Sequence, residues 1–319
     1  MNYIGHPLQI RGAEQVVLQG GKGDGMHFLI VRNGLGLECW ISLDRCADLT
    51  RVTYKGNNMG YLSPCGNVAP QYYDKEKDGF LKSFTAGFFT TAGLTAVGSP
   101  CTDEGEELPL HGTISNTPAQ LCGIDETEEG IIIRLKISDE SLFGRKLVME
   151  RSYIVSYLEN TFEVRDAVTN RGDETSPYMI LYHCNMGYPL LGEKCQLTIP
   201  HERVWATTPQ AKANMDTARQ MEAPQDRYEE RCYFYDISDP RVDLYNPAIG
   251  IGMTMTYNKD ELPCFTEWKM MGKHDYVLGL EPGNVIPQGR DKTRADGVLP
   301  TVAPDGKVHT TLQFAFYTK

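Results

Sequence analysis

Residues 161–169 read Thr-Phe-Glu-Val-Arg-Asp-Ala-Val-Thr, and apolar and polar side chains alternate along most of this stretch. Phe162, Val164 and Val168 would share one face of an extended chain, because successive side chains of a β-strand point to opposite sides. Asp166 interrupts that apolar face. The stretch therefore predicts a strand that turns one side towards an apolar core.

Comparable runs recur along the chain, rich in β-branched and aromatic residues and bounded by Gly, Pro, Asn and Asp. The best of them are residues 27–33, 36–42, 131–138, 146–155 and 250–257. Asn33-Gly34 lies between the first two runs and predicts a tight hairpin turn, since both residues tolerate positive φ. Helical patterns are limited to two short polar segments, residues 75–84 and 210–220. We expect an all-β fold.

The length of 319 residues leaves the number of domains open. No internal repeat, low-complexity stretch or Pro/Ser-rich linker divides the chain, so we expect residues 1–319 to form a single domain. The most polar and loop-like segment is 206–231. It is either an excursion over a site or a plain surface loop.

The formal net charge of −11 opposes the basic surface that nucleic acids and anionic membranes require, so we expect neither as a partner. No apolar run approaches the ~18 residues of a membrane span. The start MNYIGHPLQI lacks a basic region followed by a hydrophobic stretch, and we expect a cytoplasmic protein. The oligomeric state cannot be inferred from the sequence.

Nine cysteines, an odd number, occur without a C-x-x-C pair, which predicts neither a disulfide framework nor a zinc ribbon. We expect them to be reduced and mostly buried. Cys184 lies beside a candidate site histidine, where it is either a small buried hydrophobic residue or part of the site. The sequence also lacks a G-x-S-x-G nucleophile motif, a Walker loop and a dinucleotide-binding glycine motif, so we expect no cofactor.

Three titratable side chains lie in apolar or glycine-marked segments at expected strand ends: His111, His183 and Glu281. Buried alone, such groups are costly, so three of them suggest that they meet in one polar cleft. Taken singly, each is as easily explained as a structural residue with a satisfied hydrogen bond. Neither histidine has a histidine partner at i+2 or i+4, and we expect no metal site.

Five motifs in order resemble the aldose 1-epimerases, or galactose mutarotases, and in particular a poorly characterised branch of them. The motifs are Arg45-Cys-Ala-Asp48 with Tyr54-Lys-Gly56, Gly87-Phe-Phe-Thr-Thr-Ala-Gly-Leu94, Leu110-His111-Gly112, His183-Cys-Asn185-Met-Gly187-Tyr188-Pro-Leu190, and Leu280-Glu281-Pro-Gly-Asn284. Together they cover roughly residues 40 to 285. The resemblance implies a β-supersandwich of two large, mostly antiparallel sheets with a concave face that holds a sugar.

By motif position, the resemblance implies that His183 is the general acid, that Glu281 is the catalytic base and that His111 is a second histidine near the ring oxygen. Arg45 and Asp48 would hold sugar hydroxyls or each other. Trp268 would lie against the apolar face of the sugar or in the core. The expected sugar-binding set is Arg45, Asp48, Asn185, Glu230 and Trp268.

The activity that the resemblance implies is interconversion of the α and β anomers of an unidentified monosaccharide, a small-molecule carbohydrate. Two alternatives stay open: epimerisation or isomerisation at another carbon of an uncommon sugar or sugar acid, and carbohydrate binding without catalysis. The usual H-x-Y-F-N-L around the acid histidine and the usual Asp-His pair near position 232 are absent here, the latter replaced by Glu230-Arg231. The sugar is therefore open, and Arg45 and Arg231 could receive an anionic group.

Overall fold

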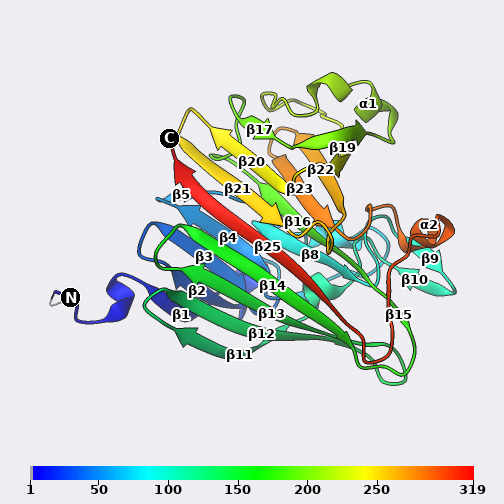
Figure 1. Ribbon diagram of the computed structural model, residues 1–319, viewed down its shortest axis with the longest axis horizontal. Helices are drawn as coiled ribbons and strands as arrows, with labels where there is room; N and C mark the ends of the chain where they lie inside the picture. The colour runs from blue at the N-terminus through cyan, green and yellow to red at the C-terminus, as the bar shows by residue number, and fades with distance from the viewer. Residues whose placement is uncertain (1–2) are drawn as a thin grey trace.

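The computed structural model describes residues 3–319, and strands are its main secondary structure (Figure 1). Residues 161–169 lie in β14, near the middle of an eight-stranded antiparallel sheet. In spatial order this sheet contains β11 (Ala119–Glu126), β12 (Gly130–Glu140), β13 (Lys146–Ser156), β14 (Thr161–Asn170), β25 (Lys307–Thr318), β21 (Ile251–Tyr257), β20 (Arg241–Asn246) and β17 (Gln196–Thr198). The expected all-β fold is confirmed.

Two further sheets complete the sandwich. The six-stranded sheet contains, in order, β18 (His201–Trp205), β19 (Arg231–Ile237), β22 (Cys264–Met271), β23 (Tyr276–Gly283), β16 (Met179–Met186) and β8 (Phe89–Leu94). The five-stranded sheet contains β1 (Gly12–Val17), β2 (His27–Arg32), β3 (Leu37–Ser42), β4 (Leu49–Tyr54) and β5 (Asn57–Asn58). The sequence motifs implied two large sheets, so the five-stranded sheet was not predicted.

The remaining elements are short. Two-stranded sheets join β6 (Tyr61–Leu62) to β7 (Ala86–Gly87), β9 (Cys101–Asp103) to β10 (Glu106–Leu108), and β15 (Ser176–Pro177) to β24 (Thr301–Val302). The α-helices are α1 (Pro209–Lys212) and α2 (Arg290–Ala295). Single 3-10 turns are η1 (Pro7–Gln9), η2 (Gly21–Gly23), η3 (Pro70–Tyr72), η4 (Gly79–Lys82), η5 (Ile114–Asn116) and η6 (Met215–Thr217).

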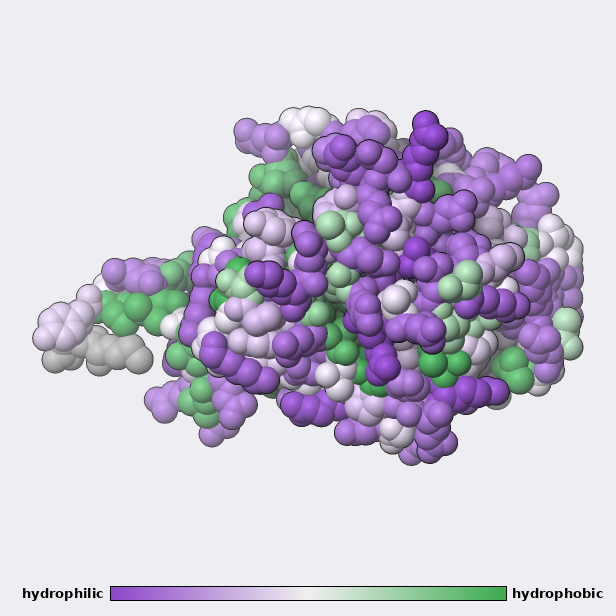
Figure 2. Space-filling view, turned by 90° about the horizontal axis from the view of Figure 1, so that it is seen from above, coloured by the Kyte–Doolittle hydropathy of each residue, from purple (hydrophilic) through white to green (hydrophobic). Residues whose placement is uncertain are grey.

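The three large sheets share one hydrophobic core. In Figure 1 the eight-stranded sheet crosses the molecule from β11 to β17. Strand β4 contacts β7 and β8, where the other two large sheets meet. One apolar cluster includes Val52 of β4, Phe314 of β25 and Leu280 of β23. The face seen from above is mainly hydrophilic, with small scattered apolar areas (Figure 2).

Three expectations need correction. The hairpin between β2 and β3 is not a two-residue Asn-Gly turn: Asn33 Oδ1 accepts the backbone N–H groups of Leu35 and Leu37, and the positive φ angles belong to Gly34 and Gly36. The predicted helical segments contain only η4, α1 and η6, whereas α2 was not predicted. Four cysteines are buried, four are partly exposed and Cys122 is exposed, so "mostly buried" was too strong.

Asp166, the polar residue in the apolar face of β14, has a buried partner. Arg151 of β13 donates to both carboxylate oxygens of Asp166, at 2.8 and 2.7 Å. The same guanidinium donates to Asp48 at 2.8 Å and to Thr91 of β8 at 2.9 Å. Asp48 directly precedes β4, so this one cation connects all three large sheets.

Among residues 3–319, no helix has both the length and the apolar character needed to cross a membrane.

Replacing Arg151 by Met should lower the free energy of unfolding by about 3–5 kcal/mol, because Asp48 and Asp166 would keep buried charges without their cation. Arg134→Met is the control, since Arg134 on neighbouring β12 makes an exposed pair with Asp125 and should cost less than about 1 kcal/mol. Urea denaturation measures both. Equal losses in the two variants would show that the buried network has no special importance.

Candidate functional site

His183 and Glu281 face each other on neighbouring strands of the six-stranded sheet. Leu181 pairs with Gly283 and Cys184 with Leu280, a register that sets His183 of β16 opposite Glu281 of β23. Directly opposed residues of antiparallel strands point to the same face. In order across the sheet, the row is Thr90, His183, Glu281, Thr266, Phe234 and Trp205.

The two side chains are in contact and almost completely buried. His183 Nε2 lies 3.2 Å from Glu281 Oε1, and the residues are 6% and 2% exposed. Gly279, two residues before Glu281 on the same face, leaves the space that the carboxylate occupies, since a Cβ there would collide with Glu281 Oε1. Thus the strand register and one glycine together place the carboxylate against the imidazole.

His111 reaches the pair from a loop. Its ring centre lies 5.5 Å from that of His183 and 5.3 Å from that of Phe80. The backbone of His111 has a φ of 59°, a left-handed conformation that is uncommon outside glycine. Two backbone hydrogen bonds hold it there, from His111 N to Gly98 O and from Gly93 N to His111 O. The structure therefore brings the three predicted catalytic residues together.

Phe84 and Trp268 pack against the imidazole of His183, each with a ring-centre distance of 5.2 Å. Both rings also line a cleft of about 590 Å³. The Trp268 indole N–H donates to Glu230 Oε2 at 2.7 Å. Glu230 lines the same cleft, so it reaches the site through its bond to Trp268.

Burial dominates the electrostatics of the site. It lowers the pKa of His183 to about 3, with a further contribution from the nearby His111, and lowers the pKa of His111 to about 4. It raises the pKa of Glu281 well above its ordinary range, and the negative charge of Glu230 adds to that shift. Burial therefore favours the neutral forms of both imidazoles and the protonated form of the Glu281 carboxyl.

Four buried polar atoms of this face have no hydrogen-bond partner among the described residues: His183 Nδ1, Asn185 Oδ1, Glu281 Oε1 and Thr266 Oγ1. The contact between Glu281 Oε1 and His183 does not have hydrogen-bond geometry, although it is close. Unpaired buried polar atoms are costly and uncommon. A ligand with hydroxyl groups would provide the partners that these atoms lack.

Arg45 and Asp48 are engaged with the protein. The Arg45 guanidinium donates to the backbone oxygens of Ser115, Val68 and Ser83. The Asp48 carboxylate accepts from Arg151 and Thr91 in the core. The two side chains therefore do not hold each other, and the structure does not bring them to the His183–Glu281 pair as sugar-binding groups.

Asn185 has a positioning role. It is fully buried, and its side-chain amide donates to the backbone oxygens of Ala86 and His183. Thr90 donates to the same Ala86 oxygen. These bonds hold the positive-φ turn at Ala86, which follows Phe84 and the wall of the cleft. Its Oδ1 has no partner among the described residues, so a sugar contact by Asn185 stays a prediction.

The sequence interpretation missed Phe84, Thr266 and Gly279. Two of them could have been found from the sequence. Thr266 lies two residues before Trp268, and Gly279 lies two residues before Glu281. In an extended strand, residues two apart point to the same face. Phe84 gave no such signal, because it ends a segment expected to be helical. Cys184 faces the apolar core, on the side of β16 away from His183.

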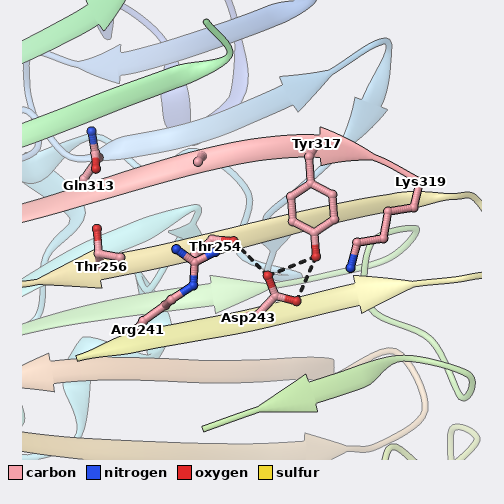
Figure 3. Close-up of a pocket in the computed structure, with 8 residues that line it drawn as sticks. Arg241, Asp243, Thr254, Thr256, Gln313, Tyr317 and Lys319 are labelled. Atoms are coloured by element: carbon pink, nitrogen blue, oxygen red, sulfur yellow. Dashed lines mark hydrogen bonds between the residues drawn. The ribbon is translucent and has the colours of Figure 1, made fainter. Parts of the chain in front are cut away.

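A second pocket, of about 320 Å³, lies on the outer face of the eight-stranded sheet (Figure 3). Its central carboxylate, Asp243 of β20, accepts hydrogen bonds from Thr254 and from Tyr317. Because these groups satisfy one another, the pocket offers little for proton transfer. Within residues 3–319 no three His, Cys, Asp or Glu side chains are grouped to bind a metal ion.

His111→Gln should make the free energy of unfolding less dependent on pH between about pH 4 and pH 6.5. The folded protein keeps His111 neutral in this window, while the unfolded chain takes up a proton, so acidification destabilises the native protein. The histidine contributes at most about 1.4 kcal/mol per pH unit to the slope, and the variant lacks it. Denaturation at a series of pH values measures the slope.

His6→Gln is the matched control, because His6 is exposed and far along the chain from the site. If the slope changed equally in both variants, His111 would not be held neutral by burial.

Comparison with known proteins shows the family and the fold of the chain. A family described as "Domain of unknown function (DUF4432)" matches residues 23–316, whereas a search of curated proteins finds no match. The structure superposes on a "putative aldose 1-epimerase" from Klebsiella pneumoniae with a TM-score of 0.89 and 25% sequence identity, over 96% of this chain and 83% of that one.

Two more distant structures share the fold. A galactose mutarotase-like protein from Clostridium acetobutylicum has a TM-score of 0.70 and 12% identity, over 98% of this chain and 100% of that one. The galactose 1-epimerase from Lactobacillus acidophilus has a TM-score of 0.63 and 12% identity, over 97% and 99%. The chain thus belongs to the DUF4432 family and has the galactose mutarotase-like fold, as its sequence motifs implied.

Proposed function

We propose that this protein is an aldose 1-epimerase that interconverts the α and β anomers of a monosaccharide. The observation that carries the proposal is the direct contact between His183 and Glu281, two groups able to exchange protons, behind the wall of a cleft. The similarity to the Klebsiella protein supports it. The chemistry itself needs only two proton transfers and no redox step.

Ring opening requires one proton to leave and one to arrive. Glu281 takes the proton of the hydroxyl on C1, while the bond between C1 and the ring oxygen breaks with its electron pair going to the ring oxygen. His183 gives a proton to that oxygen, and C1 becomes the carbon of an aldehyde. Rotation of the aldehyde followed by the reverse steps closes the ring as the other anomer. Each positioned transfer contributes about 10²–10⁴-fold.

These roles require a shift of the proton held by the pair. Burial favours the protonated form of Glu281 and the neutral form of His183 in the free protein. For Glu281 to act as base, the proton must pass to His183, 3.2 Å away. A sugar hydroxyl that donates to Glu281 and a ring oxygen that accepts from His183 both favour the charged forms, so substrate binding itself promotes the transfer.

Access to the pair requires movement of an aromatic side chain. Phe84 and Trp268 both pack on His183, and the pair is nearly inaccessible in the free protein. We infer that the sugar turns one of these rings aside and that Trp268 then lies against its apolar face. Glu230, through its bond to the indole, would fix the orientation of Trp268.

The alternatives are separated by the products. Epimerisation at another carbon changes the identity of the sugar, whereas anomer exchange leaves it intact. Binding without catalysis predicts that a sugar stabilises the protein thermally while the rate of anomer exchange stays at its uncatalysed value.

Glu281→Gln should reduce the acceleration of anomer exchange by about 10²–10⁴-fold, since an amide of the same shape cannot accept the C1 hydroxyl proton. Exchange NMR on a panel of aldoses measures the rate. Glu267→Gln is the matched control: Glu267 is a fully buried glutamate beside Thr266 on β22, but it faces away from the cleft and bonds to Tyr235. Undiminished exchange in Glu281→Gln would refute the base.

A further inference from the structure

We propose that the cleft selects a neutral sugar with an apolar portion, such as a deoxy carbon, and rejects sugars that carry a phosphate or a carboxylate. The inference rests on the proposed function in one respect: it takes the cleft beside His183 to be the sugar site. It goes beyond that function because it names the chemical class of the sugar from the composition of the cleft walls.

Apolar surface makes up much of the wall. Leu81, Phe84, Met270 and Val277 line the cleft together with the ring of Trp268. Leu81 is itself largely exposed and forms the outer edge of this wall. A methyl or methylene group of a ligand gains free energy when it leaves water for such a wall. A hydroxyl group in the same place loses its hydrogen bonds to water.

Most polar groups of the cleft are already engaged with one another. The Tyr61 hydroxyl donates to Asp275 at 3.3 Å, and the Trp268 indole donates to Glu230 at 2.7 Å. Ser63 donates to the backbone oxygen of Phe84. Tyr228 is the exception, because its buried hydroxyl has no partner among the described residues. The cleft therefore has few free donors for a sugar with a full set of hydroxyl groups.

The charges of the cleft oppose an anion. Glu230 and Asp275 both line it, and no Lys or Arg occurs among the described residues of its wall. The two arginines that could have received an anionic group are used elsewhere. Arg45 binds three backbone oxygens, and Arg231 pairs with Glu222 at 3.0 Å. An anionic sugar would approach two carboxylates without a compensating cation.

The test compares matched sugars for both binding and anomer exchange. Glucose, galactose and mannose, their 2-, 3-, 4- and 6-deoxy forms, their 6-phosphates and their uronic acids are titrated by calorimetry. At least one deoxy form should bind on the order of tenfold more tightly than its parent. The phosphates and uronic acids should bind on the order of 100-fold more weakly than the parents.

Leu81→Arg adds a cation to the exposed edge of the cleft without touching the His183–Glu281 pair. It should strengthen binding of the sugar phosphates on the order of tenfold and weaken binding of the preferred deoxy sugar, because it removes part of the apolar wall. Leu142→Arg is the control, since Leu142 is 83% exposed on the turn between β12 and β13 and does not line the cleft. It should change neither.

The outcomes separate this inference from the proposed function. Selective binding of a deoxy sugar without anomer exchange supports the inference and refutes the enzyme. Exchange with parent sugars or phosphates preferred refutes the inference and supports the enzyme. Absence of binding by every sugar refutes both. If Leu81→Arg and Leu142→Arg change the binding of the sugar phosphates equally, the inference is refuted while the proposed function is not.

Discussion

Arg151 lies inside the sandwich, and its guanidinium donates to Asp166, Asp48 and Thr91. Asp166 belongs to the eight-stranded sheet and Thr91 to the six-stranded sheet, while Asp48 directly precedes a strand of the five-stranded sheet. Tyr182 of β16 donates to Asp166 from the opposite sheet. Since such a cluster is stable only when every member is paired, it fixes how the three sheets lie on one another. His183, the next residue of β16, points to the opposite side of the sheet, towards the cleft.

The site has the opposite character to that core. In the network around Arg151 the buried charged groups are hydrogen-bonded to one another, whereas on the other face of the six-stranded sheet His183, Glu281 and Thr266 keep polar atoms without partners. Burial without pairing shifts the pKa of Glu281 upwards and that of His183 downwards, and the two groups are in contact. The same sheet thus has an inner face whose polar groups are hydrogen-bonded and an outer face on which the proposed reaction would take place.

Whether a feature of the fold or the site could be predicted from the sequence depended on how far apart in the chain the interacting residues lie. Alternation along residues 161–169 predicted β14, because strand period is local; the partner of Asp166 was not predictable, since it depends on the register with β13. Motif order predicted that His183 and Glu281 belong together. The motifs also suggested a sugar contact for Arg45, which binds backbone oxygens instead. The sequence alone does not distinguish an arginine that binds the backbone from one that binds a ligand. Phe84 reaches the site through an irregular turn that no periodic pattern marks.

The central claim is that a sugar reacts between His183 and Glu281. A crystal structure of the protein with a bound aldose tests it most directly. The account predicts the C1 hydroxyl within hydrogen-bond distance of the Glu281 carboxylate, the ring oxygen within hydrogen-bond distance of the His183 imidazole, and one of the Phe84 and Trp268 rings displaced. A sugar bound with its C1 away from both residues, or bound elsewhere while the pair stays closed, would contradict it.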